Sequence, residues 1–291
     1  MFSHLVGQLK SRAGVSSRRT MTGTRSSPDQ DRGSGEDATA SAPPAALVLQ
    51  NVSAGYGRTQ VLRDVTVVVP AHSVVAVLGA NGAGKTTMMR VAAGFLRPTS
   101  GSVLLDGVDV TTASVHERAR LGICDIPEGR GIFPSLSVRE NLLLQSFHRQ
   151  EAQVLALATE AFPILGKRLK QLAGSLSGGE QQMLALSRAY VTQPSLVLLD
   201  EVSLGLSPLL IDSVYMFLET LRSRGTSLVL IEQYVKRALE MADHVYVLDR
   251  GVVSIDMAAA DVPSSEILDV YLGQSVKGGV APGNSSTAKH P

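Results

Sequence analysis

The segment Gly79–Thr86, with the sequence GANGAGKT, points most clearly to a chemical role. It matches the phosphate-binding pattern G-x-x-x-x-G-K-[ST] without a gap. Glycines allow a backbone to wrap a polyphosphate with its N–H groups pointing inward. Lys85 would supply a positive charge to the β- and γ-phosphates, and Thr86 would supply a hydroxyl for Mg²⁺. The predicted phosphate-binding residues are Gly79, Ala80, Asn81, Gly82, Ala83, Gly84, Lys85, Thr86 and Thr87.

An acidic pair follows an apolar run further along the chain. Leu196–Asp200 is typical of a buried strand, and Glu201 comes directly after it. An acid at the carboxyl end of such a strand lies near the phosphate loop in α/β folds, so Asp200 could hold the Mg²⁺ shell. Glu201 could orient or polarise an attacking water. In isolation, such a pair is more commonly a solvated loop after a strand.

The segment Leu176–Gln182, with the sequence LSGGEQQ, precedes an apolar helical stretch, Met183–Tyr190. This order places Ser177, Gly178 and Gly179 at a helix N-terminus, where free amides and the helix dipole favour an anion. The chain would then carry a second anion-binding site. Alone, S-G-G is a weak signal and usually marks a turn before a helix.

Alternating strands and helices must position these residues. Ser73–Leu78 is a short apolar strand leading into the phosphate loop, and Thr86–Ala93 can begin a helix. Further core strands are predicted at Leu196–Leu199, Ser227–Ile231 and His244–Leu248. This alternation around a phosphate loop implies a parallel, doubly wound sheet.

Other segments predict additional parts of the same unit. Leu47–Val52 and Val61–Val69 are β-like, and Ser102–Val110 has a hairpin pattern around Asp106-Gly107. Val138–Leu172 carries Leu, Ala, Gln and Glu at helical spacing and indicates a helical insert. We expect one domain over residues 46–273, with the insert spanning about 129–176.

The two ends of the chain, residues 1–45 and 274–291, have compositions typical of disorder. The first is basic and free of acids up to Pro28, which resembles a transit peptide. We favour a simpler interpretation. Residues 1–45 are an extension without function, or the start codon is assigned too early and Met21 is an in-frame candidate start.

Composition limits the class of protein. A formal net charge of +1 offers no electrostatic case for nucleic acid binding. The single cysteine, Cys124, excludes an intrachain disulfide and fits a reducing compartment. No apolar run approaches the roughly 20 residues that cross a bilayer, so membrane association would depend on a partner.

The order and spacing of the phosphate loop, LSGGEQQ and the acidic pair resemble the nucleotide-binding subunit of ATP-binding-cassette transporters over Leu47–Gly273. The resemblance implies an α/β P-loop NTPase with a RecA-like core, an antiparallel β portion and a helical insert. It also implies ATP hydrolysis with ATP and Mg²⁺. Two subunits would stack head to tail, with ATP between the phosphate loop of one and Ser177–Gly179 of the other.

Further roles follow from the resemblance. Tyr56 lies where the family has an aromatic that stacks on adenine. Glu128 replaces the usual glutamine that senses the γ-phosphate and metal, so it joins Thr86 and Asp200 as a candidate metal ligand. Gln233 replaces the usual histidine and joins Glu201 and Lys85 as a candidate catalytic residue; a glutamine can hydrogen-bond a phosphate oxygen but cannot titrate. Val202 replaces the usual proline after the catalytic Glu, and Ser207 replaces the usual aspartate of the loop that crosses the dimer.

Several of these departures resemble one subfamily, the smaller ATP-binding subunit of branched-chain amino acid importers. The segments that carry this resemblance are Pro127–Pro134, Val202–Leu206, Ile231–Gln233 and Tyr271–Gly273. Urea and short-chain amide importers have very similar subunits. An exporter or lipid-extraction subunit, and a soluble cassette ATPase of translation or repair, are alternatives.

The subfamily implies three partners: a second cassette ATPase subunit in a hetero- or homodimer, membrane permease subunits, and a periplasmic or lipoprotein solute-binding protein. The chain would lie on the cytoplasmic face of the membrane. Glu128–Asn141 links the metal site to the helical insert and is the candidate contact with the membrane subunit.

Overall fold

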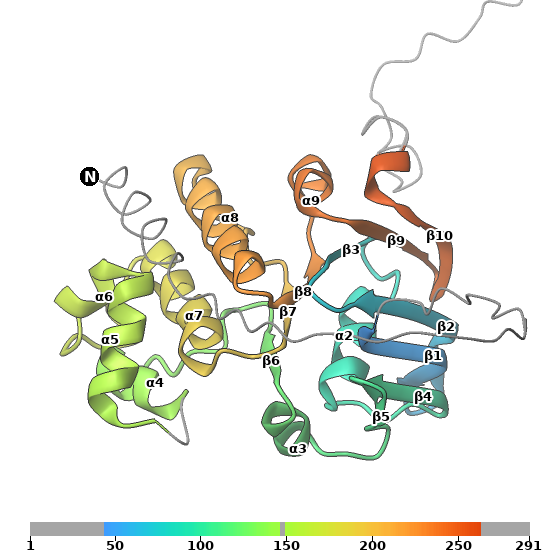
Figure 1. Ribbon diagram of the computed structural model, residues 1–291, viewed down its shortest axis with the longest axis horizontal. Helices are drawn as coiled ribbons and strands as arrows, with labels where there is room; N and C mark the ends of the chain where they lie inside the picture. Colours follow the sequence, from blue (N-terminus) through green and yellow to red (C-terminus); the bar gives the residue numbers. More distant parts are fainter. Residues whose placement is uncertain (1–43, 146–148, 263–291) are drawn as a thin grey trace, which may run out of the picture. The chain divides into compact units, whose positions relative to one another are not determined.

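The computed structural model describes residues 44–145 and 149–262 (Figure 1). The predicted disordered segments therefore lie outside the described residues, apart from residues 44 and 45. Strand β1 begins at Ala45, one residue before the predicted start of the domain. The Tyr271–Gly273 segment also lies outside the described residues. None of the described helices is long and apolar enough to span a membrane.

The sheet that carries the predicted site has six strands, in the order β10-β9-β3-β8-β7-β6. Its strands are β3 (Val74–Leu78), β6 (Ile123–Ile126), β7 (Leu196–Asp200), β8 (Ser227–Ile231), β9 (His244–Asp249) and β10 (Val252–Ala258). Pairing is parallel from β9 through β6, and only β10 runs antiparallel to its neighbour. Strands β3, β7 and β8 are buried at every residue, as expected for parallel strands covered on both faces. The predicted α/β fold is confirmed.

The two faces of this sheet pack against different helices. Successive side chains of a strand point to opposite faces. Leu199 and Leu230 therefore join the core formed with α7 (Gly178–Thr192) and α8 (Pro208–Ser223). Leu198 and Ile231 join the core formed with α2 (Lys85–Ala93) and the smaller sheet. Helix α9 (Val235–Met241) packs through Ala238 in a third cluster with Leu78.

The smaller sheet is antiparallel and forms the predicted β portion. It contains β1 (Ala45–Tyr56), β2 (Thr59–Pro70), β4 (Ser100–Leu105) and β5 (Val108–Asp109), in the order β2-β1-β4-β5. Asp106 and Gly107 both have positive φ, as a two-residue hairpin turn between twisted strands favours. The predicted hairpin is thus confirmed, with Val110 outside the strand.

Helices begin at Val138 in the region of the predicted insert, whereas residues 127–136 contain no helix. The helices are α4 (Val138–Leu144), α5 (Glu151–Ala161) and α6 (Pro163–Lys167), followed by a 3₁₀ turn at Ala173–Ser175. Ser137 begins α4 with a reciprocal capping box involving Glu140. Leu142, Val154 and Leu165 are fully buried in the same core as α7, so the insert supports the helix that carries Ser177–Gly179 (Figure 1).

A buried arginine fixes the far end of the phosphate-loop helix. Arg118, on α3 (Val115–Arg120), donates to the carbonyls of Val91 and Ala92 at 2.6 and 2.8 Å. These carbonyls lie in the last turn of α2, where acceptors lack their usual helical partners, although the Val91 carbonyl also accepts from the Gly94 N–H at 3.2 Å. A cation at a helix C-terminus also interacts favourably with the helix dipole. Burial lowers the pKa of Arg118 below its ordinary value.

Candidate active site

The phosphate loop connects β3 to α2 in a conformation that requires its glycines. Gly79, Gly82 and Gly84 all have positive φ. A Cβ on Gly79 would lie 2.3 Å from the Leu248 carbonyl oxygen, and one on Gly84 would lie 2.8 Å from the Leu62 side chain. No other residue type fits these two positions without movement of the surrounding chain. The loop ends at the N-terminus of α2, as predicted.

Lys85 is buried and turns back into the phosphate loop. Its Nζ donates to the carbonyl oxygens of Gly79 at 2.7 Å and Ala80 at 3.1 Å. Burial lowers the pKa of Lys85, whereas the charges of Glu201 and Asp200 oppose that shift. The ammonium group is thus held against the backbone of the phosphate loop, with two acids nearby.

Asp200, the last residue of β7, is 3% exposed, and its Oδ1 has no hydrogen-bond partner among the described residues. Burial, the largest cause, raises the pKa of Asp200, and the charges of Glu201 and Glu128 add to that shift. The Thr86 hydroxyl and the Lys85 charge act in the opposite direction. An unpartnered buried carboxylate oxygen beside a hydroxyl is a fitting ligand pair for a hard cation.

Glu201 and Gln233 contact each other directly. Gln233 follows β8, and its Nε2 donates to Oε2 of Glu201 at 3.0 Å. The Glu201 N–H donates to the Ile231 carbonyl at 2.9 Å, and the residue has a φ of +49°. Such a left-handed backbone is uncommon for a non-glycine residue and is often found at functional sites. The structure therefore brings the predicted general base and the predicted phosphate-contacting glutamine together.

Glu128 follows β6, beyond Pro127, and begins a tightly turned segment. Gly129, Arg130 and Gly131 have φ values of +81°, +75° and +59°. The charge of Glu128 contributes to the raised pKa of Asp200, which places the two carboxylates in one electrostatic environment. Parallel strands end at the same sheet edge, so the phosphate loop, the acidic pair, Gln233 and Glu128 all gather there.

Ser177 caps α7 as predicted, and its hydroxyl and Glu180 form a capping box. Among the described residues, no hydrogen bond or ion pair joins Ser177–Gly179 to the phosphate loop. Helices α2 and α7 belong to the cores on opposite faces of the sheet (Figure 1). The two predicted anion sites of this chain are therefore separate.

Arg130 lies over the N-terminus of α7, a contact that is not predicted from the sequence. Its Nη2 is 3.0 Å from the position of a Cβ on Gly178, and its Nη1 donates to Oε1 of Gln181. In the sequence, Arg130 stands out only as part of the segment Pro127–Pro134, which carries the subfamily resemblance. A long side chain reaching another element depends on tertiary structure, so no local sequence signal identifies this contact.

Tyr56, the last residue of β1, presents an accessible ring. Its side chain is 44% exposed, and its hydroxyl accepts a hydrogen bond from Arg90 Nη1 at 3.2 Å. Arg90 belongs to α2, so the ring lies near the helix that begins at the phosphate loop. An exposed aromatic ring can stack on a planar base.

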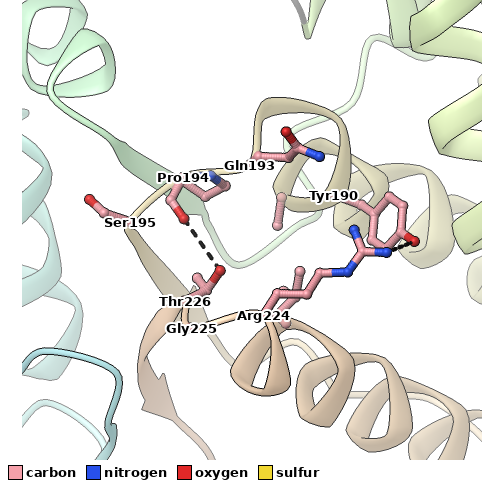
Figure 2. Close-up of a pocket in the computed structure, with 9 residues that line it drawn as sticks. Tyr190, Gln193, Pro194, Ser195, Arg224, Gly225 and Thr226 are labelled. Atoms are coloured by element: carbon pink, nitrogen blue, oxygen red, sulfur yellow. Dashed lines mark hydrogen bonds between the residues drawn. The ribbon is translucent and has the colours of Figure 1, made fainter. Parts of the chain in front are cut away.

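A separate cavity of about 420 Å³ lies where α7 and α8 end and β7 and β8 begin (Figure 2). The Arg224 guanidinium lies 3.9 Å from the centre of the Tyr190 ring, and it pairs with Glu160 at 3.6 Å. Its positive charge is therefore already compensated. This cavity lies at the opposite end of the strands from Asp200 and contains none of the predicted site residues.

Comparison with protein families matches residues 62–203 to a family described as ABC transporter. The high-affinity branched-chain amino acid transport ATP-binding protein BraG of Pseudomonas aeruginosa is 41% identical over 231 residues, covering 78% of this chain and 99% of BraG. The probable branched-chain amino acid transport ATP-binding protein LivF of Archaeoglobus fulgidus is 35% identical, covering 74% of this chain and 93% of LivF.

Two other similarities are informative. The lipopolysaccharide export system ATP-binding protein LptB of Haemophilus influenzae is 31% identical, covering 79% of this chain and 98% of LptB. A solved structure described as the ATP binding subunit of an ABC transporter has a TM-score of 0.71 and 27% identity, covering 78% of this chain and 99% of that chain.

Proposed function

This chain belongs to the ABC transporter family of ATP-binding subunits, and from this premise we propose that it hydrolyses ATP to drive import of a branched-chain amino acid. The observation that carries the proposal is the 41% identity to BraG across 99% of that protein. BraG and LivF are both named for branched-chain amino acid transport. The similarity to LptB is lower and makes export the second candidate.

ATP would bind with its phosphates in the loop Gly79–Thr86, next to Thr87, and with its adenine on Tyr56. Lys85 is the cation for the β- and γ-phosphates. Thr86, Asp200 and Glu128 would hold Mg²⁺, and the unpartnered buried Oδ1 of Asp200 supports that assignment. Mg²⁺ supplies positive charge that neutralises the phosphate oxygens. Among the described residues, no cluster of three or more His, Cys, Asp or Glu side chains could hold a metal alone, which fits a cation held largely by phosphate and water.

Glu201 orients the attacking water and takes its proton. The water oxygen forms a bond to the γ-phosphorus, while the bond from that phosphorus to the bridging oxygen of ADP breaks. Gln233 donates to the Glu201 carboxylate at 3.0 Å, which orients the carboxylate without itself titrating. The same amide nitrogen is suited to contact a γ-phosphate oxygen.

Ser177, Gly178 and Gly179 would act on the ATP held by the opposite subunit, because α2 and α7 pack on opposite faces of the sheet. We expect a mixture of a Lys85→Ala chain and a Gly178→Asp chain to associate when ATP is added, although neither chain does so alone. The mixed dimer retains one intact composite site, and its other site carries both defects. Size-exclusion chromatography with and without ATP measures this association.

Gly178 is the better position for that experiment than its neighbour. A Cβ on Gly178 meets only the end of the Arg130 side chain at 3.0 Å, whereas one on Gly179 would meet Leu210 at 2.4 Å and disturb the packing of α8. The parental chain is the positive control. If the mixture fails to associate while the parental chain does, the head-to-tail arrangement is wrong.

The partners of the proposed function are a second cassette ATPase subunit, membrane permease subunits, and a periplasmic or lipoprotein solute-binding protein. The chain would lie on the cytoplasmic face of the membrane. Glu128–Asn141 is the proposed contact with the permease. Its support is that Phe133 is 52% exposed while the Asn141 side chain bonds both backbone groups of Phe133, at 2.8 and 3.0 Å.

Disruption of the gene tests the transported solute. We expect lower uptake of labelled leucine, isoleucine or valine, because the relatives most similar in sequence are named for this transport. Complementation with the parental gene should restore uptake, and complementation with Lys85→Ala should not. If uptake of all three amino acids is unchanged and uptake of urea or amides is lost, the chain belongs to a urea or short-chain amide importer. Unchanged uptake with an envelope-lipid defect would favour export.

A further inference from the structure

A buried glutamate, Glu232, lies next to the proposed catalytic residues without a role in the chemistry above. It is 5% exposed and lies between the end of β8 and Gln233. Its Oε2 accepts a hydrogen bond from the Ser203 hydroxyl at 2.5 Å. Its Oε1 is buried and has no hydrogen-bond partner among the described residues. Burying an incompletely bonded carboxylate costs free energy, so its presence calls for a physical reason.

Ser203 is fully buried and belongs to the connecting segment Val202–Ser207, which joins Glu201 to α8. The family resemblance places the loop that contains Ser207 across the dimer. Tyr215 on α8 is a second neighbour of Glu232. Its hydroxyl is buried and has no hydrogen-bond partner in the described part of the chain, and burial together with the Glu232 charge raises the pKa of Tyr215. Glu232 therefore interacts with both the connecting segment and the helix that follows it.

The next residue along the chain contacts the proposed general base. Gln233 donates to Glu201, and Glu201 leads directly into the connecting segment. Two neighbouring residues, Glu232 and Gln233, thus hold the two ends of the stretch from Glu201 to Ser203. Because the two residues share a peptide bond, a movement of the Gln233 backbone also moves Glu232.

We propose that Glu232 is a positioning residue for ATP hydrolysis, which holds the connecting segment Val202–Ser207 in place through Ser203 while Gln233 holds Glu201. The inference rests on the proposed function, ATP hydrolysis at this site. A change at the γ-phosphate that moves Gln233 is passed to the segment facing the other subunit. Glu232 does not itself touch the nucleotide.

The charge of Glu232 strengthens this link. Burial raises the pKa of Glu232 to about 7, and the hydroxyl and amide of Ser203 and the amide of Gln233 oppose that shift. The charged or titratable groups that face it are Glu201, at the end of β7, and Tyr215, on α8; Arg237 and Glu240, on α9, act on Tyr215. An ionised carboxylate accepts hydrogen bonds about twice as strong as neutral ones. The link to Ser203 therefore strengthens as the pH rises through about 7.

Ionisation at this position also weakens the fold. The folded-state pKa of Glu232, about 7, lies above its ordinary value of 4.5, so the unfolded chain binds fewer protons at this site between those pH values. Stability conferred by the protonated form is present below pH 4.5 and lost as the pH rises through about 7.

Glu232→Gln tests the proposal because it keeps an acceptor for Ser203 and removes the charge. We expect kcat for ATP to fall about tenfold, with KM changed less than about twofold. The rise in parental kcat through pH 7 should disappear in this variant, and its thermal stability at pH 8 should equal or exceed that of the parental chain. Steady-state ATPase assays from pH 6 to 9 on the full chain, with thermal unfolding, measure these effects.

Ser203→Ala and the double variant provide the second measurement. Because the two residues act through one hydrogen bond, the double variant should be no slower than the slower single variant. Glu219→Gln, an exposed change of the same type on α8, is the matched control and should leave kcat unchanged. The inference would be overturned if Glu232→Gln had the same kcat and pH profile as the parental chain. It would also be overturned if the losses of the two single variants added in the double variant. Absence of ATPase activity in the parental chain would instead refute the proposed function.

Discussion

Glu201→Gln is expected to reduce ATP turnover by roughly 10²- to 10⁴-fold, the range typical for loss of a general base. ATP binding should persist, because the phosphate loop, Lys85 and Asp200 are unchanged. The hydrogen bond between Gln233 Nε2 and Glu201 Oε2, at 3.0 Å, can be retained by the amide oxygen of the new side chain. The loss therefore reports the missing carboxylate rather than a rearranged site. Single-turnover hydrolysis and nucleotide titration measure the two effects separately.

Glu151→Gln, an exposed change of the same type on α5, is the control for Glu201→Gln and should hydrolyse ATP at the parental rate. ATP without hydrolysis should also hold the Glu201→Gln dimer closed, since binding favours closure and turnover releases it. Hydrolysis by Glu201→Gln at the parental rate would show that this residue is not the catalytic base.

The sequence was sufficient to predict the phosphate loop and its flanking elements because local rules agree there. An apolar strand, a glycine-rich turn and a helix start occur within about 20 residues, and the structure has β3, the loop and α2 in that order. Asp200 and Glu201 could likewise be placed beside the loop because parallel strands end at one sheet edge.

Other features depended on the tertiary structure. Strand β6, Ile123–Ile126, contains a cysteine and an aspartate and is too short to show a hydrophobic period. Strand β10 is only half buried and lies at the sheet edge, although the positive φ values of Arg250 and Gly251 reveal a hairpin turn before it. Its antiparallel direction was not predicted from the alternation of strands and helices.

The contacts of Arg130 and Glu232 were also unpredictable from the sequence, but the reason is different. Both residues lie in segments that carry the subfamily resemblance, so the sequence indicated that they belong to a pattern without indicating what they touch. Arg130 reaches Gln181 on α7, and Glu232 reaches Ser203 beyond β7. A charged side chain is normally exposed, and its contacts here depend on neighbours from elements distant in sequence.

Lys85→Ala is expected to weaken ATP binding and to reduce hydrolysis by at least about 10²- to 10³-fold, the cost of removing one donor that stabilises charge in a transition state. Lys85 is 7% exposed and is the only cationic residue within the phosphate loop. Its Nζ bonds the Gly79 and Ala80 carbonyls, so the charge is positioned before nucleotide arrives. Fluorescent-nucleotide titration and an ATPase assay measure the two losses.

The loss of ATP binding and hydrolysis in Lys85→Ala should exceed that expected from one missing charge. The negative charges of Asp200 and Glu201 would remain, and no ammonium group would offset them. The charges of both acids act on Lys85, and the same acids would repel the phosphates once Lys85 is absent. Raising the Mg²⁺ concentration should therefore restore part of the binding but little of the turnover, since the metal replaces charge without replacing the γ-phosphate contact. Lys167→Ala, an exposed lysine of α6, is the matched control and should bind and hydrolyse ATP normally. Unchanged affinity and rate in Lys85→Ala would refute the assignment of Gly79–Thr86 as the phosphate site.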